Sequence, residues 1–313
     1  MYRLCVADHR PTSDHRSGGA ALQDRPRLRC PERFLAVFAV ASLVAVATGC
    51  LVVAVDDASA GAWPLDLAAW GAGAVVALAV SRFASPAFAR VVTLAAPIGL
   101  LASLAYPGQA GVHRWINIGP VHANVAALLL PAFVVALAAL VRDGSWAWLA
   151  CAACAVLLIL QPDASQATAF AAAVLIVVVR LPVARAIRIG AVVLVSSGAV
   201  MAWLRPDPLA PVAEVEGVVG LAYALSPPIA VTAVVALGGA ALAPMMVATG
   251  PERSAARTAA LALSAYFVFS ALTPLFGAFP VPLVGIGVSP VIGFWMGAGL
   301  LAAIASREDA TPD

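Results

Sequence analysis

The sequence predicts an all-α polytopic membrane protein with about ten transmembrane helices, and three observations support this fold class. Hydrophobic residues make up 63% of the 313 residues. Apolar runs long enough to cross a bilayer recur along most of the chain, and the basic residues fall almost entirely on one side of a single membrane threading. A water-soluble domain of this length would expose much of its Ala, Val and Leu, whereas a bilayer accommodates them because each helix satisfies its own backbone hydrogen bonds.

The apolar runs define the individual helices. A helix that crosses a bilayer needs roughly 20 predominantly apolar residues. Charged and turn-forming residues divide the chain into ten runs of about this length. We therefore expect helices at residues 34–55, 64–81, 88–106, 120–141, 145–161, 164–181, 186–204, 217–247, 257–277 and 283–305.

The run 217–247 is long for one span and contains Pro227 and Pro228. It predicts either one long span or a half-inserted turn followed by a full span. Two complete spans are excluded, because they would move Arg253 and Arg257 to the opposite side from most other basic residues.

The basic residues also predict the orientation. If the amino terminus is cytoplasmic, sixteen of the eighteen basic residues, all of them arginine, lie in cytoplasmic segments. Only Arg114 and Arg205 fall in outer segments. The outer segments instead carry seven acidic residues, namely Asp56, Asp57, Asp66, Asp163, Asp207, Glu214 and Glu216. Cytoplasmic segments of membrane proteins are enriched in Lys and Arg, so both termini are expected in the cytoplasm.

The two ends of the chain differ from the rest. Residues 1–32 are rich in Arg, Pro and Asp and lack an apolar period, which is typical of a disordered cytoplasmic tail that touches anionic membrane lipid. Residues 33–306 form the predicted transmembrane domain, and residues 307–313 form a short cytoplasmic tail. No nucleic-acid partner is expected.

Polar residues gather in four segments on the predicted outer face. The first is residues 111–120, which contains Arg114-Trp115-Ile116 and Gly119-Pro120. The others are Gln161-Pro162-Asp163, residues 205–217, and residues 280–290 with the sequence Pro-Val-Pro-Leu-Val-Gly-Ile-Gly-Val-Ser-Pro. Because the spans are apolar, a functional site is expected among these segments.

The order, spacing and sidedness of these segments resemble the FtsW/RodA/SpoVE family, also called the SEDS proteins. Arg114-Trp115-Ile116 with Gly119-Pro120 matches the family pattern GxxRWIxxG, and Gln161-Pro162-Asp163 matches its QPD break. Residues 280–289 form a divergent version of its PLPFxSYGGS segment. The chain departs from the family in lacking the Pro-Ser-Glu that follows the first motif and in having a much shorter fourth outer loop.

The resemblance implies a bacterial inner-membrane protein of cell-wall synthesis, cell division or cell shape that polymerises lipid-linked disaccharide-peptide (lipid II). It places Glu216 at the family's catalytic carboxylate, as a general base, and assigns Asp163 to the same catalytic site. It assigns substrate contacts to Arg114, Trp115, Gln161 and Ser289, and it implies a penicillin-binding transpeptidase as a partner. A divalent cation is compatible with the family, although no ligand spacing in this sequence indicates a metal site.

Simpler interpretations remain open for the same residues. Glu216 is placed to favour the amino terminus of the next helix, Asp163 to cap the helix after Pro162, and Trp115 to anchor the chain at the membrane interface. Three functions therefore remain: a glycan polymerase, a catalytically reduced scaffold or regulator of a cell-wall synthase complex, and a transporter of lipid-linked precursors. Fold resemblance alone does not decide among them.

Overall fold

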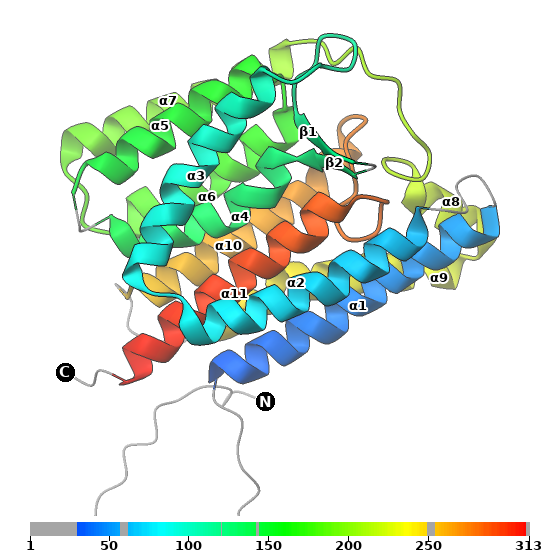
Figure 1. The fold of residues 1–313 in the computed structure, drawn as a ribbon, viewed down its shortest axis with the longest axis horizontal. Coiled ribbons are helices and arrows are strands. Elements are labelled where there is room, and N and C mark those ends of the chain that lie inside the picture. Colours follow the sequence, from blue (N-terminus) through cyan, green and yellow to red (C-terminus); the bar gives the residue numbers. More distant parts are fainter. Residues whose placement is uncertain (1–29, 57–61, 120, 142–143, 249–253, 311–313) are drawn as a thin grey trace, which may run out of the picture.

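The chain folds into a bundle of helices with one small β-hairpin (Figure 1). The structure is a computed structural model that describes residues 30–56, 62–119, 121–141, 144–248 and 254–310. Its elements are α1 (Cys30–Asp56), α2 (Trp63–Phe83), α3 (Pro86–Leu104), β1 (Trp115–Ile118), β2 (Val121–Asn124), α4 (Val125–Leu140), α5 (Trp146–Leu160), α6 (Ala164–Arg180), α7 (Arg185–Leu204), α8 (Val218–Leu225), α9 (Pro227–Leu242), the 3-10 turn η1 (Ala243–Val247), α10 (Ala255–Leu272), the 3-10 turn η2 (Thr273–Leu275) and α11 (Val288–Ala310).

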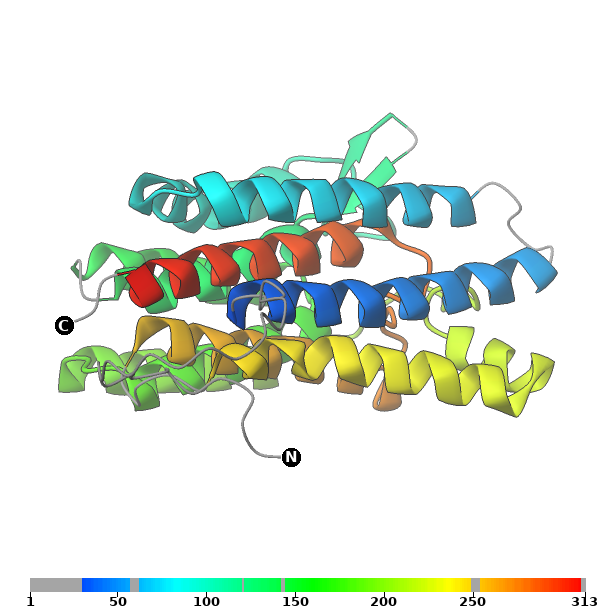
Figure 2. The same ribbon diagram turned by 90° about the horizontal axis from the view of Figure 1, so that it is seen from below.

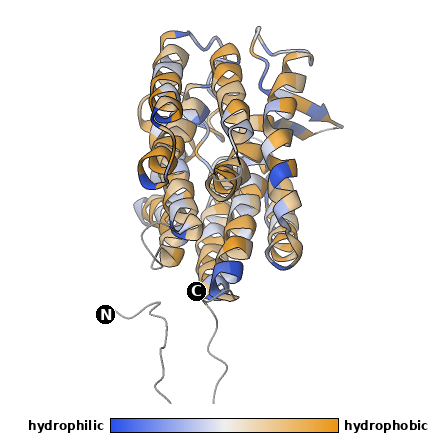
Figure 3. Ribbon diagram, turned by 90° about the vertical axis from the view of Figure 1, so that its left-hand side faces the viewer, coloured by the Kyte–Doolittle hydropathy of each residue, from blue (hydrophilic) through white to orange (hydrophobic). Residues whose placement is uncertain are grey.

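The helices have the length and composition of membrane spans. Within the described residues, seven are long and apolar enough to cross a membrane, namely α1, α2, α3, α7, α9 with η1, α10 with η2, and α11. Helices α4, α5 and α6 are apolar but shorter, with 16, 15 and 17 residues. Most of the residues along the helices are hydrophobic (Figure 3). The predicted fold class, an all-α multi-pass membrane protein, is confirmed.

Helices α4 and α11 form the centre of the bundle. Almost every residue of α4 is buried, and α11 packs against both α2 and α4 (Figures 1 and 2). The contact between α4 and α11 is close at Gly293, where a Cβ atom would overlap the carbonyl oxygen of Ala127. Helix α7 lies at the periphery, with only Val195, Gly198 and Ala202 buried. Small residues permit such close helix contacts in membranes, where no water drives the helices together.

Several helices begin at a polar side chain that accepts a hydrogen bond from the exposed backbone N–H groups of the first turn. Ser85 caps α3, Asn124 caps α4, Asp163 caps α6 and Ser254 caps α10. Each cap satisfies a donor that would otherwise lack a partner within the helix. Two of these caps, Asn124 and Asp163, lie beside each other at one end of the bundle.

Three predicted spans differ clearly from the structure. The span expected at 120–141 begins as strand β2 and becomes helical only at Val125, because β2 pairs with β1. The last span begins at Val288 rather than residue 283, since residues 281–287 form a turn-rich connection. The run 217–247 breaks at Ser226, where the following prolines start α9 and separate it from the short α8. The structure is therefore closer to the alternative of a short turn followed by a full span than to the alternative of one long span.

Helices extend into the two predicted tails. Helix α1 already begins at Cys30, three residues before the predicted transmembrane domain, and α11 continues to Ala310. Residues 1–29 of the predicted amino-terminal tail and residues 311–313 lie outside the described residues.

The two ends of the bundle differ in their charged residues. The β-hairpin, α8 and the connection between α10 and α11 lie at one end (Figure 1). The first residue of α1 and the last residue of α11 lie at the opposite end. Eight of the arginines within the described residues also belong to helix ends or first and last turns there, namely Arg33, Arg82, Arg90, Arg180, Arg185, Arg188, Arg257 and Arg307.

Candidate functional site

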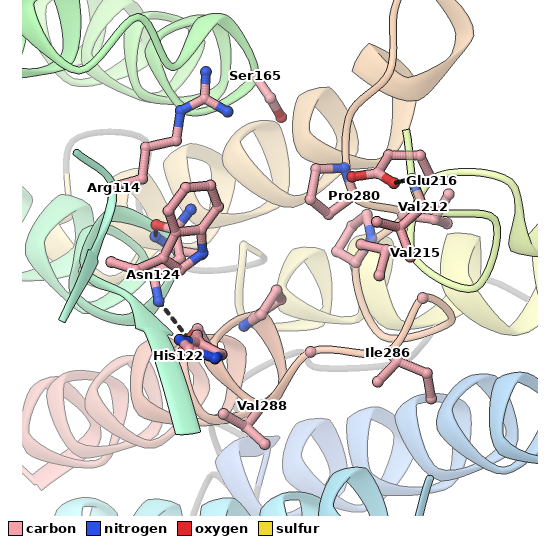
Figure 4. A pocket seen from close by; sticks show the side chains of 18 of the residues that line it. Arg114, His122, Asn124, Ser165, Val212, Val215, Glu216, Pro280, Ile286 and Val288 are labelled. Carbon is pink, nitrogen blue, oxygen red and sulfur yellow. Dashed lines mark hydrogen bonds between the residues drawn. The ribbon is translucent and has the colours of Figure 1, made fainter. Parts of the chain in front are cut away.

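A cavity of about 470 Å³ opens at the hairpin end of the bundle. Its walls come from the hairpin, the start of α6, the loop between α7 and α8, and the connection between α10 and α11 (Figure 4). Five of the six predicted site residues line it, namely Arg114, Trp115, Asp163, Glu216 and Ser289. Segments that are far apart in the sequence thus meet around one cavity with a largely apolar wall and a few converging polar groups, which is the usual form of a ligand site.

Arg114 joins three of these segments. It lies just before β1 and is only 5% exposed. Its Nε donates to the carbonyl oxygen of Gln161 (3.2 Å), and its Nη2 donates to the carbonyl oxygen of Pro162 and to Oδ2 of Asp207 (2.8 Å). Oδ2 of Asp163 is 3.8 Å from Nε. The guanidinium therefore ties the hairpin to the α5–α6 turn and to the α7–α8 loop, with most of its donors engaged within the protein.

Asp163 and Ser289 belong to a network around Asn124. Oδ1 of Asp163 accepts the N–H of Gln166 (3.1 Å), which confirms its predicted role as the cap of α6. Its Oδ2 lies 3.5 Å from Nδ2 of Asn124. Asn124 accepts the N–H of Ala127 (3.0 Å) and donates its own backbone N–H to Oγ of Ser289 (2.9 Å). The starts of α4, α6 and α11 are thereby held together at the cavity.

Glu216 lies across the cavity from Arg114, in the turn that precedes α8 (Figure 4). Its Oε2 accepts the N–H of Val212 (2.6 Å), and its own N–H donates to the carbonyl oxygen of Val212 (2.9 Å). The side chain is half-buried. Burial raises the pKa of Glu216, and the negative charge of Asp207 adds to this, while the Val212 N–H and the positive charge of Arg114 oppose it. A carboxylate with a raised pKa is a stronger base.

The backbone that carries Glu216 is fixed by the α10–α11 connection. Val281 donates its N–H to the carbonyl oxygen of Val215 (3.1 Å), and Ile286 donates to the carbonyl oxygen of Glu214 (3.0 Å). The position of Glu216 thus depends on residues more than sixty positions later in the chain.

Of Trp115 and Gln161, the structure places only Trp115 at the cavity. Trp115 lines the cavity, and its ring centroid lies 6.0 Å from the guanidinium carbon of Arg114, at the outer range of a cation–π contact. Gln161 is fully buried and does not line the cavity. Its Nε2 donates to the carbonyl oxygen of Leu100 (3.0 Å) and to Oγ of Ser103 (2.6 Å). The structure therefore gives Gln161 a role in joining α3 to the α5–α6 turn in place of the predicted substrate contact.

Sequence reasoning did not assign several polar residues of the cavity to the site, among them Asp66, Asn124 and Asp207. Asp66 was counted only as one of the acidic residues of the outer segments; it lies in the first turn of α2 and is only 3% exposed. A carboxylate at the start of an apolar span is a signal that could have identified it, since ionisable residues inside membrane segments usually serve a function. Asp207 carries no comparable signal, because its pairing with Arg114 spans 93 residues.

The cavity carries more negative than positive groups. Four carboxylates line it (Asp66, Asp163, Asp207 and Glu216) against the single guanidinium of Arg114. Among the residues that the structure describes, no group of three or more His, Cys, Asp and Glu side chains could hold a metal ion.

The chain resembles known proteins clearly in its fold but not in its sequence as a whole. No family model and no curated protein matches the sequence. The fold, however, is similar to the crystal structure of the rod shape determining protein RodA of Thermus thermophilus, with a TM-score of 0.61, 20% identity, and coverage of 88% of this chain and 97% of that one. A variant of the same protein gives a TM-score of 0.63, 19% identity, and coverage of 88% and 98%.

A third similar structure belongs to a peptidoglycan synthase complex described as coordinating polymerization and crosslinking. It gives a TM-score of 0.60 and 19% identity, and the match covers 88% of this chain and 98% of that one. The SEDS-like fold expected from the motifs is thus confirmed over most of the chain. At this level of identity the similarity establishes the fold, and the chemistry has to be argued from the site itself.

Proposed function

We propose that the protein takes part in bacterial cell-wall synthesis by binding a lipid-linked sugar such as lipid II in this cavity and extending a glycan strand, with Glu216 as general base. The observation that carries the proposal is the convergence of Glu216, Asp163 and Arg114 on one cavity from three distant segments. Had these side chains faced separate helix surfaces, no such site would exist. The similarity in fold to RodA, a rod shape determining protein, also supports this proposal.

The proposed reaction is a glycosyl transfer between two lipid-linked sugars. A hydroxyl oxygen of the acceptor sugar forms a bond to the anomeric carbon of the donor, while the bond from that carbon to the diphosphate breaks. Glu216 takes the hydroxyl proton, and the polyprenyl diphosphate leaves with the bonding electron pair. The raised pKa of Glu216 suits this role, because a base works best when its pKa lies near the working pH.

Arg114 and Asp163 act in this proposal as positioning residues. Arg114 uses Nε and Nη2 on the protein itself, so it shapes the wall of the cavity rather than serving chiefly as a diphosphate ligand. Asp163 caps α6 and lies 3.8 Å from Nε of Arg114, so that it orients the guanidinium. Trp115 and Ser289 supply an aromatic face and a hydroxyl to the cavity wall.

The proposed location is the bacterial inner membrane, with the cavity on the outer face and both termini in the cytoplasm. In support, most of the described arginines lie at the end of the bundle away from the cavity, as expected for the cytoplasmic side. A lipid-linked sugar displayed on the outer leaflet could then reach the cavity from the membrane.

The proposed partner is a penicillin-binding transpeptidase, which would crosslink the strands that this protein makes. A similar fold occurs in a peptidoglycan synthase complex that coordinates polymerization with crosslinking. Many side chains on the helix surfaces of the bundle are apolar and exposed, so a partner helix could pack there without burying charge.

The test uses purified protein with fluorescent lipid II. Wild type and Glu214→Gln should form glycan polymer, whereas Glu216→Gln should form none. Glu214 is a matched control, since it lies two residues away and does not line the cavity. Polymer formation by Glu216→Gln at the wild-type rate would refute the role of Glu216.

A second candidate, a catalytically reduced scaffold, is favoured by a specific observation. The carboxylate of Glu216 already accepts a hydrogen bond within its own turn, and Arg114 is largely engaged by the protein. Absence of polymer from the wild type, combined with capture of a transpeptidase from cells and unchanged capture by Glu216→Gln, would support the scaffold over the enzyme.

A further inference from the structure

Asp66 is a buried carboxylate on the cavity wall that the proposed reaction does not use. It lies in the first turn of α2, is 3% exposed, and lines the cavity beside the α10–α11 connection. Its two carboxylate oxygens both approach the backbone N–H of Gly287, at 3.2 and 3.0 Å. This N–H is the one hydrogen-bond donor that Asp66 has within the described residues.

A single donor leaves most of the hydrogen-bond acceptor positions of the Asp66 carboxylate without a partner in the described residues. An ionised carboxylate has about four acceptor positions, and a buried polar group without partners costs free energy. Within the described part of the chain, Arg114 forms ion pairs with Asp163 and Asp207, and no cation pairs with Asp66. The remaining acceptor positions of Asp66 therefore suit a hydrogen-bond donor that arrives with a ligand.

The negative charge of Asp66 restricts which chemical groups of a ligand this side chain can bind. A diphosphate is repelled by a carboxylate, and it offers only acceptor oxygens. Hydroxyl groups and amide N–H groups are neutral donors, and the hydrogen bonds that they donate are stronger when the acceptor is ionised. The sugar part of a lipid-linked sugar carries both kinds of donor.

We infer that Asp66 binds hydroxyl or amide N–H groups of the sugar portion of the ligand and thereby selects glycosylated lipids over bare polyprenyl diphosphate. The inference rests on the proposed function, because it names a specificity residue of the same cavity. Asp66 lies on α2, whereas Glu216 lies before α8, so the two carboxylates contact the ligand from different elements. Asp66 holds the sugar, and Glu216 takes the proton.

The test measures two dissociation constants for each variant, one with lipid II and one with undecaprenyl diphosphate, which lacks sugar. Asp66→Asn keeps an oxygen for the Gly287 N–H but replaces the second acceptor with an amide donor. It should weaken lipid II binding by about 10- to 100-fold, as expected for hydrogen bonds to a charged group. Binding of undecaprenyl diphosphate should change by less than about threefold.

Asp309→Asn is the matched control, since it removes the same charge from an exposed site at the far end of α11. It should leave both dissociation constants unchanged. Both probes are measured on one preparation, so partial unfolding of Asp66→Asn would weaken them equally and leave their ratio intact.

Three results would overturn the inference. Equal weakening of both probes would mean that Asp66 acts only through the fold or through a bound cation. Unchanged binding of both probes by Asp66→Asn would mean that the Gly287 contact is its only role. If wild type binds lipid II no better than undecaprenyl diphosphate, the proposed function fails together with the inference.

Discussion

Gly285 and Val215 lie in van der Waals contact through their backbones, so closely that a Cβ atom at position 285 would overlap the carbonyl oxygen of Val215. The same carbonyl accepts the N–H of Val281. Glu216 directly follows Val215, so the proposed base is positioned by a glycine in the connection between α10 and α11. This contact makes Gly285 a site where one methyl group should disturb the chemistry.

We expect Gly285→Ala to lower the polymerisation rate by about a hundredfold, because a displacement of roughly 1 Å in a catalytic group costs about that much. The matched control is Gly220→Ala in α8, where a Cβ atom meets nothing within 4 Å. Rates measured with fluorescent lipid II check the prediction. Equal rates for the two variants would show that the position of the turn at residues 212–216 does not limit the reaction.

Removal of the Arg114 guanidinium should destabilise the protein. Arg114→Ala leaves the carboxylates of Asp163 and Asp207 near the cavity without their cation. Loss of one partner from a buried ion pair typically costs about 3–5 kcal/mol in the free energy of unfolding. Thermal unfolding in detergent should show a clear fall in the apparent melting temperature.

Arg205→Ala provides the comparison for Arg114→Ala. Arg205 is exposed and donates to the carbonyl oxygens of Ile159 and Leu160, so its removal should have a much smaller effect on the melting temperature. If Arg114→Ala unfolds at the same temperature as Arg205→Ala but loses affinity for undecaprenyl diphosphate, Arg114 is a ligand for the diphosphate rather than a positioning residue.

The pKa of Glu216 predicts the pH dependence of the reaction. Glu216 must be ionised to accept a proton, so kcat/KM should fall as the pH drops through its pKa. Because burial raises that pKa, the acid limb should lie above the ordinary range for glutamate. Profiles of wild type and Glu214→Gln should coincide. A limb within or below the ordinary range would exclude Glu216 as the base.

The same pKa shift has a defined effect on stability. At pH values between the ordinary pKa of the unfolded chain and the raised pKa of the folded protein, Glu216 binds more protons in the folded protein than in the unfolded chain. The stability that this group contributes is therefore full below the ordinary pKa and is lost as the pH rises through the raised value. The unfolding free energy of wild type relative to Glu216→Gln should fall across this window. A rise across it would contradict the burial of Glu216.

The contact between α4 and α11 should tolerate no added side chain. Gly293→Ala places a methyl group on the carbonyl oxygen of Ala127, and overpacking of this kind typically costs about 1–3 kcal/mol. Gly238→Ala in α9 is the matched control, because a Cβ atom there meets nothing within 4 Å and alanine favours the helix. Unfolding experiments in detergent should show lower stability for the first variant only.

Much of the fold follows from the sequence, because a bilayer selects long apolar helices. The spans that match best are those bounded by charges or prolines, such as α2, α6 and α7. The hairpin was missed because the predicted span was started at residue 120, which placed the four residues Val121–Asn124 in a helix. Their backbone pairs instead with β1, and this tertiary pairing leaves no periodic signal in so short a strand.

The candidate site was only partly predictable for a similar reason. Motif spacing identified Arg114, Asp163 and Glu216, and the structure brings them to one cavity. It did not reveal that Gln161 points away into the bundle, since a motif does not specify side-chain direction. Nor did it reveal Asp66, whose significance depends on the Gly287 backbone 221 residues away.

Cysteine labelling with a membrane-impermeant maleimide tests whether the cavity faces outward and binds a lipid-linked sugar. In a background with the five native cysteines replaced, Val212→Cys places a thiol in the cavity, and Ala184→Cys places one at the opposite end of the bundle. Intact cells should label position 212 but not position 184, and added lipid II should slow labelling at position 212. Labelling of position 212 only after the membrane is opened, or at a rate that lipid II does not change, would contradict this prediction.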